Sequence, residues 1–253
     1  MINEQIQGYA DAAQDRRRKA RRLLAVGDLP SAVSEFATAL EQIQAGLNRL
    51  SEEESPDSRN PTDEDRDLAT LFADLQGIKG GIYRDMVALD PSNAERSIKA
   101  YDAGARYERD FALKSTYNFV NQLVVRFVAL PDLLNDQQTS LTLEGRNGDL
   151  ETDSVAGWLD RADQHVEDGY SRRDDPAWAL ADLVLLGALR SSSDLPKRLI
   201  RFESQVDRDR DIYPYASLDR VIGDLLRVTS PNSTVGASLR ELAGWLKPRL
   251  PAS

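Results

Sequence analysis

Apolar residues recur at helical spacing along most of the chain. In one such stripe, positions i, i+3, i+4, i+7 and i+8 are taken by Leu218, Val221, Ile222, Leu225 and Leu226. The segment 178–189 is apolar almost all round, which is typical of a helix enclosed by its neighbours. The pattern therefore predicts an all-α protein. We expect about ten helices, near residues 3–26, 29–50, 62–88, 92–109, 112–130, 154–169, 175–190, 195–206, 214–228 and 233–246.

Polar residues that can cap a helix precede several of these segments. Asp28 and Asp175 each stand just before a stretch with proline in its first turn, and Thr62 precedes the acidic run 63–65. A side-chain oxygen at this position can accept a hydrogen bond from a free backbone N–H of the first turn. These residues therefore predict where three of the helices begin.

Two segments interrupt the helical pattern. Residues 51–61 are polar, acidic and contain proline, which predicts a solvated loop. Residues 135–153 contain a glycine-rich stretch, and Leu141 and Leu143 alternate with polar residues before it. A short β-hairpin and a plain loop are both compatible with this second segment.

Composition and charge narrow the function classes. The chain has 42 acidic and 32 basic residues, a formal charge of −10, which disfavours general binding to nucleic acid. It has no cysteine, which excludes disulfides, thiolate metal sites and thiol nucleophiles and is typical of a reducing compartment. The N-terminus lacks a signal-peptide pattern, and the apolar stretch Trp178–Leu189 is too short to span a bilayer. We therefore expect a cytoplasmic protein with no membrane partner.

The segment around residues 27–40 resembles the second half of a tetratricopeptide repeat. That family has a Gly-Asp turn, here Gly27–Asp28, followed by a small, an aromatic and a small residue, here Ala32, Phe36 and Ala39. The small side chains let two helices approach closely, and the aromatic ring fills the gap toward the next pair. The resemblance implies a right-handed superhelical solenoid of about five antiparallel helix pairs. We expect it to form a single domain over residues 1–253.

A second match to the same repeat covers Gly77–Tyr107. Gly77, Gly80 and Gly81 are unfavourable in a helix, at roughly 1 kcal/mol each relative to alanine. Close packing of the backbone against a neighbouring helix is the interpretation that we favour, and a loop is the alternative. Tyr101 takes a repeat position in the second helix of this pair.

The order of short motifs from about residue 75 to 228 is similar to a larger family. Gly80–Met86, a helix centred on Tyr101, Asn118–Asn121, Pro176–Trp178 and Pro214–Ser217 resemble the TRAF-binding regulatory region of the apoptosis signal-regulating kinases and its stand-alone bacterial relatives. The resemblance covers about 150 of the 253 residues. It implies a non-catalytic, regulatory scaffold for protein–protein interaction. The motifs of a kinase domain are missing, so kinase activity is not implied.

In tetratricopeptide arrays, first helices line a concave groove in which amides and basic groups hold an extended peptide. By that resemblance, the groove would use residues from two neighbouring first helices. Asn118 and Gln122 are four residues apart and share a helix face, and we expect both to face solvent in the free protein. The predicted partner-binding residues are Lys79, Arg84, Tyr117, Asn118, Gln122 and Arg126.

The strongest charge feature is a basic segment of six cations in seven positions. They wrap most of a helix, so this helix cannot be enclosed on all sides. One interpretation is that the segment binds nucleic acid or another anionic ligand. The interpretation that we favour is internal neutralisation by the acidic runs 52–54 and 63–65. The segment, called the basic segment below, comprises Arg16, Arg17, Arg18, Lys19, Arg21 and Arg22.

Two further groups, a histidine and an aspartate-rich run, could suggest catalysis or metal binding. The neighbouring residues in the sequence support neither role. His165 is the single histidine, and the sequence supplies no nucleophile for it to activate, so we interpret it as a helix-surface residue. The run Asp207–Asp211 alternates aspartate with arginine, and the arginines would repel a metal ion. We predict no catalytic residue, metal or cofactor. The sequence is compatible with a homo-oligomer.

Overall fold

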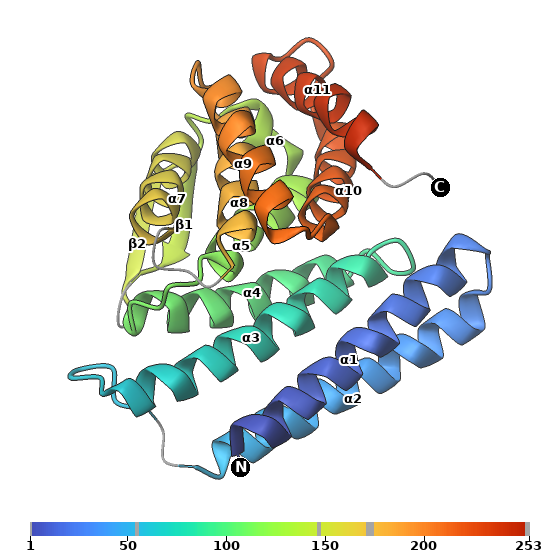
Figure 1. Ribbon diagram of the computed structural model, residues 1–253, viewed down its shortest axis with the longest axis vertical. Helices are drawn as coiled ribbons and strands as arrows, with labels where there is room; N and C mark the ends of the chain where they lie inside the picture. Colours follow the sequence, from blue (N-terminus) through green and yellow to red (C-terminus); the bar gives the residue numbers. More distant parts are fainter. Residues whose placement is uncertain (1, 54–55, 146–147, 171–174, 251–253) are drawn as a thin grey trace. The chain divides into compact units, whose positions relative to one another are not determined.

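The computed structural model describes residues 2–53, 56–145, 148–170 and 175–250. Within these residues the protein is helical apart from one two-stranded hairpin, as predicted (Figure 1). The first helices are α1 (Ile2–Ala25), α2 (Leu29–Ser51), α3 (Asp63–Met86), α4 (Asn93–Asp110), α5 (Tyr117–Ala129) and α6 (Pro131–Asn135). The hairpin strands β1 (Ser140–Glu144) and β2 (Leu150–Ser154) follow. The remaining helices are α7 (Val155–Tyr170), α8 (Pro176–Leu189), α9 (Leu195–Asp209), α10 (Tyr213–Val228) and α11 (Thr234–Leu246).

The ten expected helices are all present, and the segment 135–153 forms the hairpin. Its strands pair antiparallel, with Leu141 opposite Asp153 and Leu143 opposite Glu151. Two details differ from the prediction. The five-residue helix α6 was missed. Helix α5 begins at Tyr117 instead of 112, because α4 ends at Asp110 and Ala112 adopts a left-handed conformation that cannot continue a helix.

The predicted caps are present at two of three positions. The Asp28 side chain accepts a hydrogen bond from the Ser31 N–H, and Thr62 forms a reciprocal capping box with Asp65. Asp175 occupies the N-cap of α8, but its side chain makes no capping hydrogen bond.

The chain divides into two compact units. Unit 1 consists of residues 1–113 and 145–148, and unit 2 consists of residues 114–144 and 149–253.

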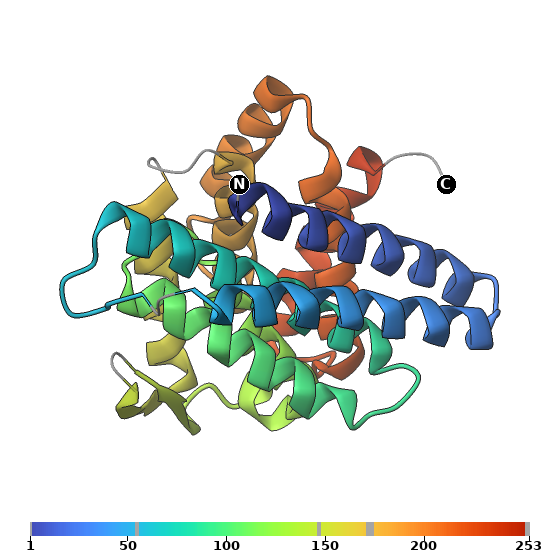
Figure 2. The same ribbon diagram turned by 90° about the horizontal axis from the view of Figure 1, so that it is seen from below.

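Unit 1 contains two pairs of antiparallel helices, α1 with α2 and α3 with α4 (Figures 1 and 2). Its core is built on fully buried apolar side chains, among them Phe36, Ile43, Leu75 and Ile82. In both views the turn between α1 and α2 extends past the turn between α3 and α4. Phe36, which the tetratricopeptide resemblance predicts to fill a gap between helix pairs, is fully buried.

In unit 2, helix α8 is the centre. It packs against α5, α7, α9, α10 and α11, which explains why it is apolar almost all round. The Trp158 indole N–H donates to the Leu141 carbonyl at 2.8 Å and ties α7 to the hairpin. A linear array, in which each repeat touches only its neighbours, has no such central helix.

Candidate functional site

Three of the four exposed cations of the basic segment bind carboxylates within unit 1. Arg16 and Lys19 both reach Glu35 of α2, at 3.0 and 2.5 Å, and Arg18 pairs with Asp15 one turn earlier. Arg22 is the member of the segment that has no ion pair among the described residues.

The partners that we predicted for this segment are wrong. The antiparallel pairing of α1 and α2 places the basic segment beside the first half of α2, whereas the runs 52–54 and 63–65 follow its far end. Those runs bond locally instead: Glu52 and Glu53 pair with Arg49, and Asp63 with Arg66. Glu54 lies outside the described residues.

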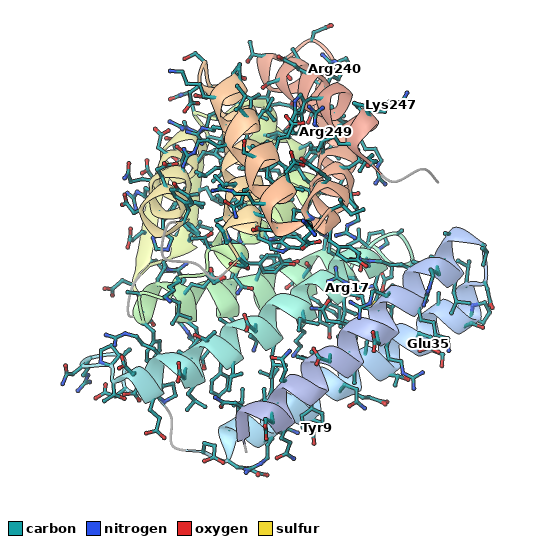
Figure 3. All side chains as sticks on the ribbon, in the orientation of Figure 1. Tyr9, Arg17, Glu35, Arg240, Lys247 and Arg249 are labelled. Carbon is teal, nitrogen blue, oxygen red and sulfur yellow. The ribbon has the colours of Figure 1, made fainter. Side chains whose placement is uncertain are left out.

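Arg17 and Arg21 converge on one carboxylate, Asp85 of α3. The Arg17 Nε lies 2.5 Å and the Arg21 Nε 2.6 Å from the same oxygen of Asp85. Arg17 is only 6% exposed and donates a further hydrogen bond to the Gly81 carbonyl at 2.7 Å (Figure 3). This arginine is therefore an internal tie between α1 and α3 and is not available to a ligand.

The electrostatics of this cluster keep it charged. Burial alone would raise the pKa of Asp85, but the charges and hydrogen bonds of Arg17 and Arg21 outweigh burial and hold it well below its usual range. Burial also lowers the pKa of Arg21, yet a guanidinium titrates so far above neutrality that it stays protonated.

Two adjacent glycines make room for this tie and for the next helix. A Cβ at Gly81 would lie 2.3 Å from the Arg17 guanidinium, and a Cβ at Gly80 would lie 2.9 Å from the Tyr101 ring of α4. The Ser97 hydroxyl also donates to the Gly80 carbonyl at 2.8 Å. The close packing predicted from the glycines is confirmed at these two positions.

Helix α2 carries a second apolar stripe beside its buried one. Leu29 is 50% and Val33 is 45% exposed, Ala37 is exposed, and Leu40 is half-buried. Their spacing, continued to the exposed Gln44, is i, i+4, i+8, i+11 and i+15, which follows one helix face. We call the set of Leu29, Val33, Ala37, Leu40 and Gln44, together with Lys79, the α2 surface.

Lys79 reaches the end of this stripe from α3. Its Nζ lies 3.4 Å from the Gln44 Oε1, and it has no ion pair among the described residues. Burial lowers the pKa of Lys79. The α2 surface therefore combines exposed apolar side chains with one uncompensated positive charge.

The six predicted partner-binding residues are divided between the units. Lys79 and Arg84 belong to unit 1, and Lys79 lies beside α2, a second helix, rather than beside the first helix α1. The other four residues lie on α5 of unit 2, where Tyr117 and Arg126 are half-buried.

The two amides of that set are buried. Asn118 and Gln122 are each 1% exposed, so the expectation that they face solvent is wrong. Helix α5 is buried on nearly all sides from residue 118 to 125, which leaves no solvent-facing position for them. The Gln122 Nε2 has no hydrogen-bond partner among the described residues.

Sequence reasoning missed a second buried arginine cluster, in unit 2. Arg198 of α9 is 8% exposed and binds Asp163 of α7, Asp194 and the Leu183 carbonyl of α8. Arg190 also binds Asp163, at 2.8 Å. Asp163 and Arg198 lie 35 residues apart, so no local spacing indicates their contact.

An open pocket lies next to this cluster, lined by Gln137, Ala156, Asp160, Arg190 and Ser192. Its polar groups are already engaged. Arg190 pairs with Asp160 at 2.6 Å, Ser192 donates to Asp194, and the Gln137 Nε2 donates to the Leu189 carbonyl. The pocket therefore offers a ligand no free charged group.

The remaining features are the single histidine, the acidic side chains and the apolar helices. His165 is half-buried on α7, and its ring packs edge-on against Phe119. The described residues contain no cluster of acidic or histidine side chains that could hold a metal ion. No helix in the described part of the chain is long and apolar enough to cross a membrane.

Comparisons with known proteins return no relative. No family model, no curated protein and no solved structure matches the chain.

Proposed function

We propose that this chain is a non-catalytic protein-interaction scaffold that binds a helical segment of a partner along the α2 surface. The observation that carries the proposal is the exposed apolar stripe of α2, which ends at a half-buried lysine without a carboxylate. A contiguous apolar patch with a defined charge at one end is a feature of surfaces that bind other proteins.

The spacing of the stripe selects the kind of segment. A helix laid along α2 would meet Leu29, Val33 and Leu40 with its own residues at i, i+4 and i+11 positions. An acidic side chain or a terminal carboxylate on that helix would neutralise Lys79. The partner segment is therefore amphipathic, with an acidic group at one end.

The tetratricopeptide resemblance belongs to the same proposal. The two packed helix pairs of unit 1 and the buried Phe36 support it, and the clustering of helices around α8 in unit 2 does not. A right-handed solenoid of about five pairs, a regulatory role like that of the kinase region and a cytoplasmic location stay proposals with it.

Binding of an anionic ligand through the basic segment is the second candidate. Arg22 favours it, because its exposed side chain has no ion pair among the described residues. The other five cations have carboxylate partners within unit 1, which favours the α2 surface. Binding to phosphate would weaken steeply as salt rises, and binding to an apolar stripe would not.

The test compares capture of native partners by the wild-type chain and two matched variants. Val33→Glu places a charge on the α2 surface, and Leu150→Glu places one on an apolar residue of the hairpin that is 76% exposed, against 45% for Val33. We expect Val33→Glu to capture at least about tenfold less of a specific partner than the wild type does, because binding would remove water from the new carboxylate in an apolar contact. We expect Leu150→Glu to retain that partner. Equal capture by both variants would show that the α2 surface is not the binding site.

A further inference from the structure

The α2 surface is self-complementary. The midpoint between Val33 and Leu40 coincides with the midpoint between Leu29 and Gln44, and both fall beside Ala37. An antiparallel copy of α2 centred there would place Val33 against Leu40 and Leu29 against Gln44, twice over. This is the residue pattern that a two-fold interface requires, because each contact between residues i and j is repeated between j and i.

The charges of the surface agree with this register. Lys79 reaches Gln44 at one end of the stripe, and Asp28 stands next to Leu29 at the other end. One oxygen of Asp28 caps α2 by accepting from the Ser31 N–H, and the carboxylate has no ion pair among the described residues. Antiparallel pairing would bring Lys79 of each copy to Asp28 of the other. Each half-buried ammonium would then gain the carboxylate that it lacks within its own chain.

The size of side chains along the stripe also fits. Ala37 lies at the crossing point, where a small residue allows two helix axes to approach to about 8 Å. The larger Val33, Leu40 and Leu29 stand to either side of it. The turn between α1 and α2 extends past the turn between α3 and α4, so the α3–α4 pair stops short of the first turns of α2 (Figures 1 and 2).

We infer that a second copy of this chain occupies the α2 surface, in an antiparallel pairing of α2 with α2 about a two-fold axis beside Ala37. The inference rests on the proposed function, since it names the partner of the same surface. The segment Leu29–Gln44 is about 22 Å long at 1.5 Å per residue, so the contact is smaller than the roughly 800 Å² per partner of a stable dimer. The dimer therefore forms reversibly and depends on protein concentration.

The first test exchanges the two charges. Alone, Lys79→Glu faces Asp28 with a second negative charge, and Asp28→Lys faces Lys79 with a second positive charge. Mixed in equal amounts, the two variants can form a heterodimer in which both contacts are attractive again. Dimerisation is measured by sedimentation velocity over a concentration series. We expect each variant alone to dimerise at least about tenfold more weakly than wild type, and the equal mixture to dimerise about as strongly as wild type. Circular dichroism checks that Asp28→Lys, which removes a helix cap, remains folded.

The second test uses the absence of cysteine. Ala37→Cys introduces a single thiol at the crossing point, where two copies would come within disulfide distance. Under mild oxidation we expect a covalent dimer from Ala37→Cys and none from Ala237→Cys, a similarly exposed alanine on α11.

The outcomes separate this inference from the proposed function. A wild-type chain that stays monomeric at every concentration overturns the homodimer. So does a dimer that neither charge variant weakens. If the wild type is monomeric and Val33→Glu still loses a captured protein, the proposed function holds and a different helix occupies the surface. Recovery of dimer in the mixed sample together with cross-linking at position 37 supports a second copy.

Discussion

Two buried arginines, Arg17 in unit 1 and Arg198 in unit 2, both tie helices together, but their carboxylate partners are arranged differently. Each connects helices that are distant in sequence, and each packs beside a glycine, Gly81 or Gly187. Arg17 and Arg21 share the single carboxylate of Asp85. Arg198 has two carboxylates and a carbonyl.

The comparison teaches that the cost of losing an ion pair depends on what remains for the partner. Without Asp85, Arg17 and Arg21 both lose the carboxylate that they share, and Arg17 retains the Gly81 carbonyl among its acceptors. Without Asp163, Arg198 retains Asp194 and the Leu183 carbonyl, and Arg190 retains Asp160. In unit 1 one carboxylate thus serves two arginines, whereas in unit 2 Arg198 has two carboxylates.

The largest effect is expected from Asp85→Asn. The substitution removes the carboxylate shared by Arg17 and Arg21, and breaking a buried ion pair costs about 3–5 kcal/mol of unfolding free energy. Denaturant unfolding followed by circular dichroism measures the loss. Asp15→Asn is the control, because the Arg18–Asp15 pair is exposed and contributes at most about 1 kcal/mol. Equal midpoints for the two variants would refute the central role of Asp85.

A smaller loss is expected from Asp163→Asn. It removes charged hydrogen bonds worth roughly 1.5–3 kcal/mol, while both arginines keep other acceptors. The same unfolding measurement applies. If Asp163→Asn destabilised the protein more than Asp85→Asn, unit 2 would be the less redundant of the two.

The third expected effect is steric. Gly81→Ala puts a methyl group where the Arg17 guanidinium lies, and such overpacking costs about 1–3 kcal/mol. In Arg17→Met, which removes the guanidinium, the same glycine substitution should cost much less. A double-mutant cycle measures the difference, and strictly additive effects would show that Arg17 does not occupy this space.

The smallest effect is a dependence on acid pH. Because the pKa of Asp85 is lowered in the folded state, its stabilisation is fully present above the unfolded value near 3.9. It is lost as pH falls through the folded value. Below about pH 4, stability of the wild type should therefore fall more steeply than that of Asp85→Asn. Equal slopes of stability against pH for the wild type and Asp85→Asn would contradict the lowered pKa of Asp85.

Periodicity predicted the helices because a buried face leaves a direct mark in the sequence. It placed α8 among neighbours, the tetratricopeptide resemblance predicted a packed position for Phe36, and the paired glycines predicted a close helix contact. The contacts of Arg17 with Asp85 and of Arg198 with Asp163 could not be predicted, since they join residues 68 and 35 positions apart and other acids were nearer in sequence.

The candidate site was harder to predict than the fold. A stripe of apolar residues shows which face of a helix is apolar, and it does not show how much of that face other helices cover. For this reason the exposed half of α2 was missed. Asn118 and Gln122 were predicted to face solvent and are buried. The error arose because an amide side chain in an apolar helix can be buried as readily as exposed.

The Arg17–Asp85 tie also has a consequence for the order of folding. Arg16 and Glu35 are 19 residues apart, so the pairing of α1 with α2 is a local event, whereas Arg17 and Asp85 are separated by 68 residues. Contacts between distant residues pay a larger loop-closure entropy and tend to form late. The tie therefore closes after the first hairpin exists, and its loss should speed unfolding while leaving the folding rate nearly unchanged. We therefore expect the Asp85 contacts to slow the unfolding of unit 1.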